Sequence, residues 1–454
     1  MRKNWSILAG LLICAQAFLA CSNSVSTFVT ETEEPQTTAE EIAAADTSAA
    51  EINTEADTTV LEEPSEPDTS VQEITISDTA SDTTVTVDTV NTDTTTHDAA
   101  LEDSNELHFI LEEDGITSGK MYLNYPADSF LTRFEIGDIV TVAINGYDTL
   151  EMPVAESSSD VPIAGFLVAA IKGSDQLVLT AHNAKLASVL GITAENAPIE
   201  VSVSLKEKGG YLLGLDIMRN TQYMGSYAEN YPDLSVEEFA NFREVHTTGM
   251  GEHKLYRSSS PIYLYLGRNY YADSLAQAAG VTTFINLADS ESSAYSNKGY
   301  ETTYYSTQNI IFLGVPPEFF SEIFKVGLVI GFRYMIEHEG PYLVHCTYGM
   351  DRTGFMIAVL EALMGATTEE IQDDYAKTFS NYFTMVNGKK VALNEQQIDF
   401  FKAVVLRNLK AVYHAEGVDI SDPQKADWAS ATERYLEKLG VTQEEIFALK
   451  ERLK

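Results

Sequence analysis

A cysteine and an arginine six positions apart are the side chains in this sequence best suited to chemistry on a phosphate group. Cys346 and Arg352 bracket a short stretch that contains Gly349. An arginine guanidinium can bind two phosphate oxygens at once, and a cysteine thiolate is a strong nucleophile. We therefore expect Cys346 to attack phosphorus while Arg352 stabilises the charge on the phosphate oxygens.

The residues around this pair predict a tight loop between a strand and a helix. Tyr342 to Val344 is a short apolar run typical of a buried strand, and residues 353–363 repeat apolar side chains at helical spacing. Backbone N–H groups at a helix N-terminus, together with the helix dipole, favour a bound anion. Gly349 and Gly354 carry no Cβ atom to obstruct the turn. The same environment should ionise the Cys346 thiol.

The ten residues His345 to Gly354 resemble the catalytic loop of the cysteine-dependent protein tyrosine phosphatase superfamily, in the form typical of its bacterial tyrosine phosphatase branch. The resemblance implies an α/β fold with a central sheet flanked by helices. It also implies hydrolysis of phosphate monoesters through a phosphocysteine, with no metal or other cofactor. Substrate contacts are expected from His345, Thr347, Tyr348, Gly349, Met350, Thr353 and Gly354. Among these, the Thr353 hydroxyl should bond the sulfur, and His345 should fix the loop rather than take a proton.

Two carboxylates are candidates for the general acid. Asp351 lies inside the loop, and relatives with Asp at this position are thought to use it. Asp289 follows the predicted strand 281–287 and could lie on the same rim. Each residue also has a non-catalytic alternative. Asp351 could form a salt bridge that stabilises the loop, and Asp289 could be an exposed loop carboxylate. Arg243 and Arg257 could also contact phosphate, although surface ion pairs are the commoner role of such residues.

The substrate class is less tightly specified. Several lipid and inositol-phosphate phosphatases of the superfamily carry Lys directly before the Asp-Arg pair, where this chain has Met350. Tyr348 offers an aromatic wall instead. Both features favour a phosphorylated protein or small phosphate ester, with protein tyrosine (or dual-specificity) phosphatase as the leading reading. A phosphoinositide or inositol-phosphate (phytate-type) phosphatase and a catalytically silent phosphate-binding protein remain the alternatives.

Charge excludes one class of partner. The formal net charge is −39, and a nucleic-acid partner would require basic patches. Much of this charge is local, because residues 22–106 contain 22 Asp and Glu and no Lys or Arg. A segment this polar, with charges of one sign, cannot bury enough apolar surface to fold. We therefore expect a disordered tether.

The N-terminus predicts export. Two basic residues precede an apolar run over Trp5 to Ala20, and the run ends at Cys21. This pattern resembles a bacterial lipoprotein signal peptide, in which Cys21 would be lipidated, and an ordinary secretory signal or a short anchor is the alternative. We expect an exported protein, anchored to a bacterial membrane through this lipid only and facing outside the cytoplasm. Cys346 would then be the single thiol of the folded part.

The chain divides into four predicted segments. These are a signal peptide (1–21), the acidic linker (22–106), a β-rich domain of unassigned role (107–210) and a tyrosine phosphatase-like catalytic domain (211–454). Within the last, Asn241-Phe242-Arg243 and Leu255-Tyr256-Arg257-Ser258 resemble entry segments of the bacterial branch, so the resemblance covers about 241–453. Helices are predicted at 185–190, 275–280, 319–337 and 394–415, and one or two strands at 301–315.

Overall fold

The computed structural model describes residues 106–117, 119–220, 222–223, 234–386, 389–390 and 392–454, all within the unit Thr95–Lys454. The predicted signal peptide with Cys21, and the acidic linker up to residue 105, lie outside the described residues. Strand β1 begins at Glu106, the last residue assigned to that linker. No helix in the described ranges combines the length and the apolar character needed to cross a bilayer.

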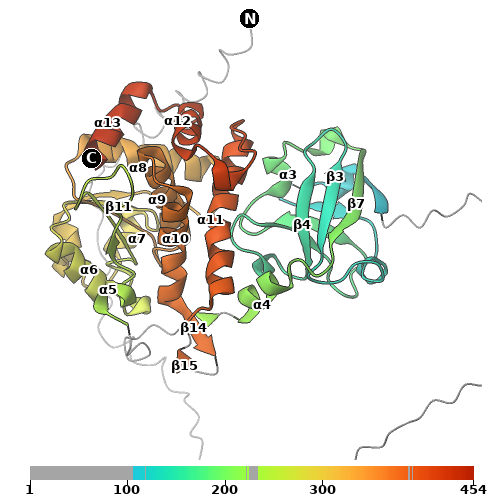
Figure 1. Cartoon of the computed structure of the whole chain (residues 1–454), viewed down its shortest axis with the longest axis horizontal. Helices are drawn as coiled ribbons and strands as arrows, with labels where there is room; N and C mark the ends of the chain where they lie inside the picture. The colour runs from blue at the N-terminus through green and yellow to red at the C-terminus, as the bar shows by residue number, and fades with distance from the viewer. Residues whose placement is uncertain (1–105, 118, 221, 224–233, 387–388, 391) are drawn as a thin grey trace, which may run out of the picture. The chain divides into compact units, whose positions relative to one another are not determined.

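A seven-stranded sheet forms the first part of the described chain (Figure 1). Along β3, Val140, Val142 and Ile144 are buried and alternate with half-buried residues, the pattern of a strand with one face on a core. The strand order is β1-β7-β3-β4-β5-β6-β2, and only β4 and β5 pair in parallel. The elements are β1 Glu106–Leu111, β2 Met121–Leu123, α2 Ala127–Phe130, β3 Ile139–Ile144, β4 Leu150–Ala155, β5 Phe166–Ala169, β6 Leu177–Ala181, α3 Leu186–Val189 and β7 Ile199–Glu207.

A five-stranded sheet forms the centre of the second part. Its order is β12-β11-β13-β10-β9, with the first four strands parallel and β9 antiparallel at the edge. The central strand β13 aligns His345 with Ser258 of β10 and with Asn286 of β11. These three strands therefore end at one edge, where open α/β sheets place their ligands. The strands are β9 Arg243–Glu244, β10 Leu255–Ser258, β11 Thr283–Asn286, β12 Asn309–Phe312 and β13 Tyr342–His345.

Helices cover both faces of this sheet. Successive residues of a strand point to opposite faces, and accordingly Val344 of β13 joins the core formed with α8 to α13, whereas Leu343 joins the core formed with α6 and α7. The helices are α4 Leu212–Asn220, α5 Val236–Phe239, α6 Asn269–Ala278, α7 Glu291–Tyr295, α8 Glu322–Glu337, α9 Asp351–Met364, α10 Thr368–Tyr382, α11 Glu395–Ala415, α12 Trp428–Lys438 and α13 Gln443–Leu453. A small sheet pairs β8 Gln222–Tyr223, β14 Phe383–Val386 and β15 Lys389–Lys390. The predicted α/β fold, a central sheet flanked by helices, is confirmed.

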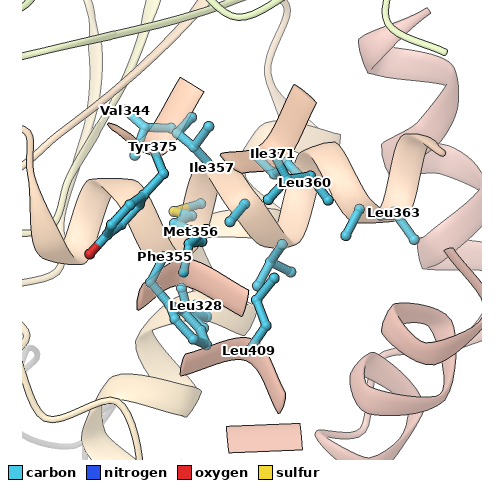
Figure 2. Packing of buried hydrophobic residues seen from close by; sticks show 14 of the residues in the cluster. Leu328, Val344, Phe355, Met356, Ile357, Leu360, Leu363, Ile371, Tyr375 and Leu409 are labelled. Atoms are coloured by element: carbon cyan, nitrogen blue, oxygen red, sulfur yellow. The ribbon is translucent and has the colours of Figure 1, made fainter. Parts of the chain in front are cut away.

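Helix α9 lies at the centre of the larger core (Figure 2). Every residue from Thr353 to Leu363 is buried, so this part of the helix is covered by protein on all sides. Leu328 of α8, Tyr375 of α10 and Leu409 of α11 pack around it. The helix start is therefore fixed by packing, and so is the loop that precedes it.

Several predicted elements differ from the observed ones at their ends. Helix α8 begins at Glu322, not at 319, because the Ser321 hydroxyl caps it by accepting from the Phe324 amide (3.2 Å). Helix α6 begins at Asn269, six residues before the predicted start. The segment 301–315 holds one strand, β12, and the short 3₁₀ turn at Tyr305–Thr307 replaces a second.

Candidate active site

The loop that carries Cys346 lies between β13 and α9, at the carboxyl edge of the sheet. Cys346 is 3% exposed and has no disulfide partner. Gly349 has φ +67° and packs so tightly on β10 that an added Cβ would lie 2.1 Å from the Ser258 carbonyl oxygen. No other residue type fits there without a shift of the backbone. The chain thus turns around the cysteine in a fixed, compact loop.

The carbonyl groups of this loop are bound from outside it. The Thr347 carbonyl accepts from the Ser260 amide (3.1 Å). The Tyr348 carbonyl accepts from the Tyr382 hydroxyl (2.8 Å) and from Asn241 Nδ2 (3.3 Å). The N–H group of a peptide plane points away from its C=O group. The Gly349 carbonyl is also bound, by Arg257 and Asn241. The N–H groups of residues 348–350 are therefore directed to the side opposite these three carbonyls, as in an anion-binding loop.

Arg352 is held in place by three acceptors. Its Nη1 donates to the Leu287 carbonyl (3.2 Å) and to the Val315 carbonyl (3.0 Å), and its Nη2 donates to the Thr347 hydroxyl (3.1 Å). The two carbonyls belong to segments that follow β11 and β12. A half-buried guanidinium fixed in this way has little rotamer freedom left to lose when a phosphate binds.

The Thr353 hydroxyl is buried, and it has no hydrogen-bond partner among the described residues. A buried hydroxyl without a partner is costly unless a further group satisfies it. This is the environment expected of a hydroxyl that serves a charged sulfur or a bound anion.

His345 is fully buried and lies between two oxygens, with Nε2 3.1 Å from the Tyr305 hydroxyl and Nδ1 3.4 Å from the Cys346 carbonyl. Burial lowers its pKa to about 4, although the charge of Asp289 opposes this shift. His345 is therefore neutral near pH 7, which agrees with a role in fixing the loop rather than in accepting a proton.

The two candidate acids lie in different environments. Asp351 is the first residue of α9, and burial raises its pKa to about 6, against the opposing charge of Arg352. Asp289 instead accepts hydrogen bonds from Asn286 Nδ2 (3.1 Å) and Ser293 Oγ (3.2 Å). A carboxyl held protonated near pH 6 can donate a proton, whereas the oxygens of Asp289 are engaged in local structure.

Two residues of the predicted loop, Met350 and Gly354, take positions that the sequence did not indicate. Met350 is 2% exposed and packs in the larger core, so its side chain is not exposed to a substrate. Gly354 faces Tyr375 of α10, and a Cβ there would lie 2.7 Å from the ring. Tyr348 is half-buried, with its ring edge-on to Tyr382 at 5.8 Å.

The expectation of surface ion pairs for Arg243 and Arg257 is wrong, and these residues are not placed at the phosphate either. Both donate to Asp374 of α10, and Arg257 also donates to the Gly349 carbonyl (2.9 Å). Their partners are more than 90 residues away in sequence, so local patterns gave no signal of the contact. A polar stripe at helical spacing on α10, Asp374, Thr378 and Asn381, was the available clue.

Cys21 lies outside the described residues, so its lipidation stays a prediction. Within the described ranges, no three His, Cys, Asp or Glu side chains gather closely enough to form a metal site.

One comparison with known proteins covers the part of the chain that contains this loop. The model of the tyrosine phosphatase family matches residues 327–454, which include the whole loop, most of α8 and all of α9 to α13. The resemblance expected from residue 241 onward is therefore matched only in its C-terminal part. No curated protein matches the chain in sequence at a significant level.

Three solved structures are similar to parts of the chain. An uncharacterized conserved protein from Thermotoga maritima is 20% identical, with a TM-score of 0.20, over 23% of this chain and 37% of its own length. The core catalytic domain of the PP-IP phosphatase SIW14 from S. cerevisiae is 21% identical, with a TM-score of 0.23, over 36% of this chain and 83% of its own. A DUF442 protein from Shewanella putrefaciens is 17% identical, with a TM-score of 0.21, over 38% and 97%.

The loop sequence, the bound guanidinium and the family match agree on a phosphatase that uses a cysteine. Residues 327–454 of this chain are similar to the tyrosine phosphatase family, whose model they match.

Proposed function

We propose that this enzyme is a protein tyrosine (or dual-specificity) phosphatase that hydrolyses phosphate monoesters through a phosphocysteine. One observation carries the proposal: the carbonyls of the loop around Cys346 are bound from outside, which fixes the orientation of its peptide planes beside the Arg352 guanidinium, as in a loop that holds phosphate oxygens. Donors fixed in advance around a developing charge are the usual source of such catalysis.

The reaction has two steps. The Cys346 sulfur attacks phosphorus and forms an S–P bond, while the ester P–O bond breaks and Asp351 gives its proton to the leaving oxygen. Arg352 and the loop amides stabilise the charge on the equatorial oxygens. Water, which Asp351 now deprotonates, then attacks the phosphocysteine, and the Thr353 hydroxyl stabilises the departing sulfur. The step releases inorganic phosphate and restores the thiolate.

Tyr348 and Met350 support a singly phosphorylated substrate. Tyr348 is braced by the ring of Tyr382, so it can serve as a rigid wall for an aromatic ester. Met350 is buried where the inositol-phosphate enzymes carry a lysine, so no added positive charge faces a second phosphate from that position. The strongly negative chain would also repel polyphosphorylated ligands at long range.

Hydrolysis of p-nitrophenyl phosphate tests the reaction. We expect C346S to lose at least about 1000-fold in kcat, because it removes the nucleophile. Equal rates in wild type and C346S would show that the chain is a silent phosphate-binding protein or acts by another chemistry. Phosphotyrosyl peptides, phosphoinositides and inositol hexakisphosphate, compared at matched concentration, test the substrate class. Faster hydrolysis of either inositol substrate than of the peptides would overturn the tyrosine assignment.

The cellular location belongs to the same proposal. The sequence up to Cys21 supports export and a lipid anchor outside the cytoplasm. Growth of an expressing bacterium with labelled palmitate should label the wild-type chain, and C21A should carry no label. Labelling that persists in C21A would contradict the anchor.

A further inference from the structure

A buried cluster of charged residues lies behind the catalytic loop and plays no part in the reaction described above. Asp374 of α10 accepts from Arg243 of β9 (Nε to Oδ1, 2.7 Å) and from Nη1 of Arg257 of β10. The side chains of Arg257, Asp374 and Arg243 are 0%, 10% and 16% exposed. Burying three charges costs several kcal/mol in desolvation, which their attraction offsets only with good geometry.

Asp374 is the anion that pairs with both arginines. Burial opposes its charge, but the attraction and hydrogen bonds of Arg243 and Arg257 outweigh burial and lower its pKa. Glu361 of α9 also interacts with this cluster, but burial raises its pKa well above the usual value, and its carboxyl oxygens have no hydrogen-bond partner among the described residues. The Thr378 hydroxyl accepts from Nη2 of both arginines, at 3.0 and 3.3 Å.

The cluster reaches the loop by two routes. Directly, Nη2 of Arg257 donates to the Gly349 carbonyl at 2.9 Å. Indirectly, Nη1 of Arg243 donates to Asn241 Oδ1 (2.8 Å), and Nδ2 of the same Asn241 donates to the Tyr348 and Gly349 carbonyls. The amide oxygen of Asn241 also accepts from Asn381 (3.0 Å), which fixes the orientation of this side chain. The direct route ends on the peptide plane that follows Gly349, and the indirect route ends on this plane and on the one that follows Tyr348.

We propose that Arg257 and Asp374, together with Arg243 and Asn241, are positioning residues that hold these two peptide planes with their N–H groups toward the phosphate. The inference rests on the proposed phosphatase reaction. None of these side chains touches the substrate. Their effect on the reaction passes through the orientation of these two peptide planes.

A purely structural role would not require this geometry. An ion pair that only joined α10 to the sheet could end at Asp374, yet the guanidinium of Arg257 is divided between that carboxylate, the Thr378 hydroxyl and a carbonyl of the loop. If the Gly349 carbonyl lost its donors, its peptide plane could rotate and turn an oxygen toward the phosphate. That rotation would replace an attraction by a repulsion at the reacting centre.

The test compares two alkylating agents on Cys346 of the full chain. Iodoacetate carries a carboxylate that the loop amides attract, and iodoacetamide is a neutral analogue of nearly the same size. Mass spectrometry of the Cys346 peptide gives the rate constant for each agent, free of the signals of Cys14 and Cys21. Unfolded protein would react without preference for the anion, so each variant is first shown by circular dichroism to be folded, and the ratio of the two rates then reports the loop itself.

We expect R257M and D374N to lower the iodoacetate-to-iodoacetamide ratio by about 10-fold and kcat/KM for p-nitrophenyl phosphate by about 10- to 100-fold, the effect of one hydrogen bond to a charged group. R257K should recover part of both losses. The matched control is R333M, which breaks the Arg333–Glu445 pair (2.7 Å) between α8 and α13 and should change neither quantity. Unchanged ratios in R257M and D374N would overturn the proposal.

A milder variant keeps the test decisive if the charge variants fail to fold. Y382F removes only the hydroxyl that donates to the Tyr348 carbonyl and leaves the ring in place. We expect a fall of about 2- to 5-fold in the same ratio, and no change would contradict the proposal. A wild-type enzyme that neither prefers iodoacetate nor hydrolyses p-nitrophenyl phosphate would refute the phosphatase function itself, whereas an active wild type with unaffected variants refutes the positioning role alone.

Discussion

Gly349 and Ser258 lie in closer contact than any side chain at position 349 would permit. A Cβ atom on Gly349 would lie 2.1 Å from the Ser258 carbonyl oxygen and 2.9 Å from the Ser259 amide nitrogen. The catalytic loop is therefore packed directly against the backbone that leaves β10, and its shape depends on that contact.

Substitution of Gly349 should consequently destabilise the fold as well as the site. We expect G349A to lose about 3 kcal/mol or more of unfolding free energy, from strain at φ +67° and from overpacking. The matched control is G365A at the end of α9, where φ is +94° but nothing lies within 4 Å of an added Cβ, and we expect about 1–2 kcal/mol there. Urea unfolding measures both, and equal losses would contradict the close contact.

The pKa of Asp351 sets a pH dependence. Since a general acid must be protonated, and burial raises this pKa to about 6, kcat should fall as pH rises through about 6. D351N should lower kcat by about 100-fold or more for an alkyl phosphate with a poor leaving group, and it should abolish that limb of the pH profile. Steady-state rates between pH 4.5 and 8 test this prediction. If kcat of D351N still fell as pH rose through about 6, another residue would be the general acid.

Asp351 should also oppose stability at alkaline pH. Its folded-state pKa lies above the usual value of 3.8, so its protonated form stabilises the fold below pH 3.8, and this contribution is lost as pH rises through about 6. D351N mimics the protonated form, and we expect it to be more stable than wild type at pH 8 by about 1 kcal/mol and equal to it near pH 4. Thermal unfolding at the two pH values checks the sign.

Asp289 provides the contrast to Asp351. Because its oxygens accept from Asn286 and Ser293, we expect D289N to keep kcat within about threefold of wild type and to retain the pH limb. The variant has one acceptor oxygen where Asp289 has two, so its NH2 group must face either Asn286 Nδ2 or the Ser293 hydroxyl, and the unfolding free energy should fall by about 1 kcal/mol. A loss of activity as large as that of D351N would make Asp289 the acid.

The chemistry of the loop could be predicted from sequence because it is local. Cys346, Arg352 and the helix that follows lie within one strand–loop–helix unit, where spacing and apolar periodicity are informative. Residues whose partners are distant could not be placed in this way. Arg257 and Gly349 are 92 positions apart, and Arg243 and Asp374 are 131 apart. The burial of Met350 could not be predicted for a related reason, because it depends on the core around α9 and not on its neighbours in sequence.

The guanidinium of Arg352 donates two hydrogen bonds to protein carbonyls, those of Leu287 and Val315. These hydrogen bonds fix the guanidinium before any ligand binds, so an anion can bind with almost no rearrangement of Arg352. The product, inorganic phosphate, can therefore bind the site as readily as the substrate does. Inorganic phosphate should therefore compete at the end of each turnover, and the enzyme would work fastest where its product is carried away.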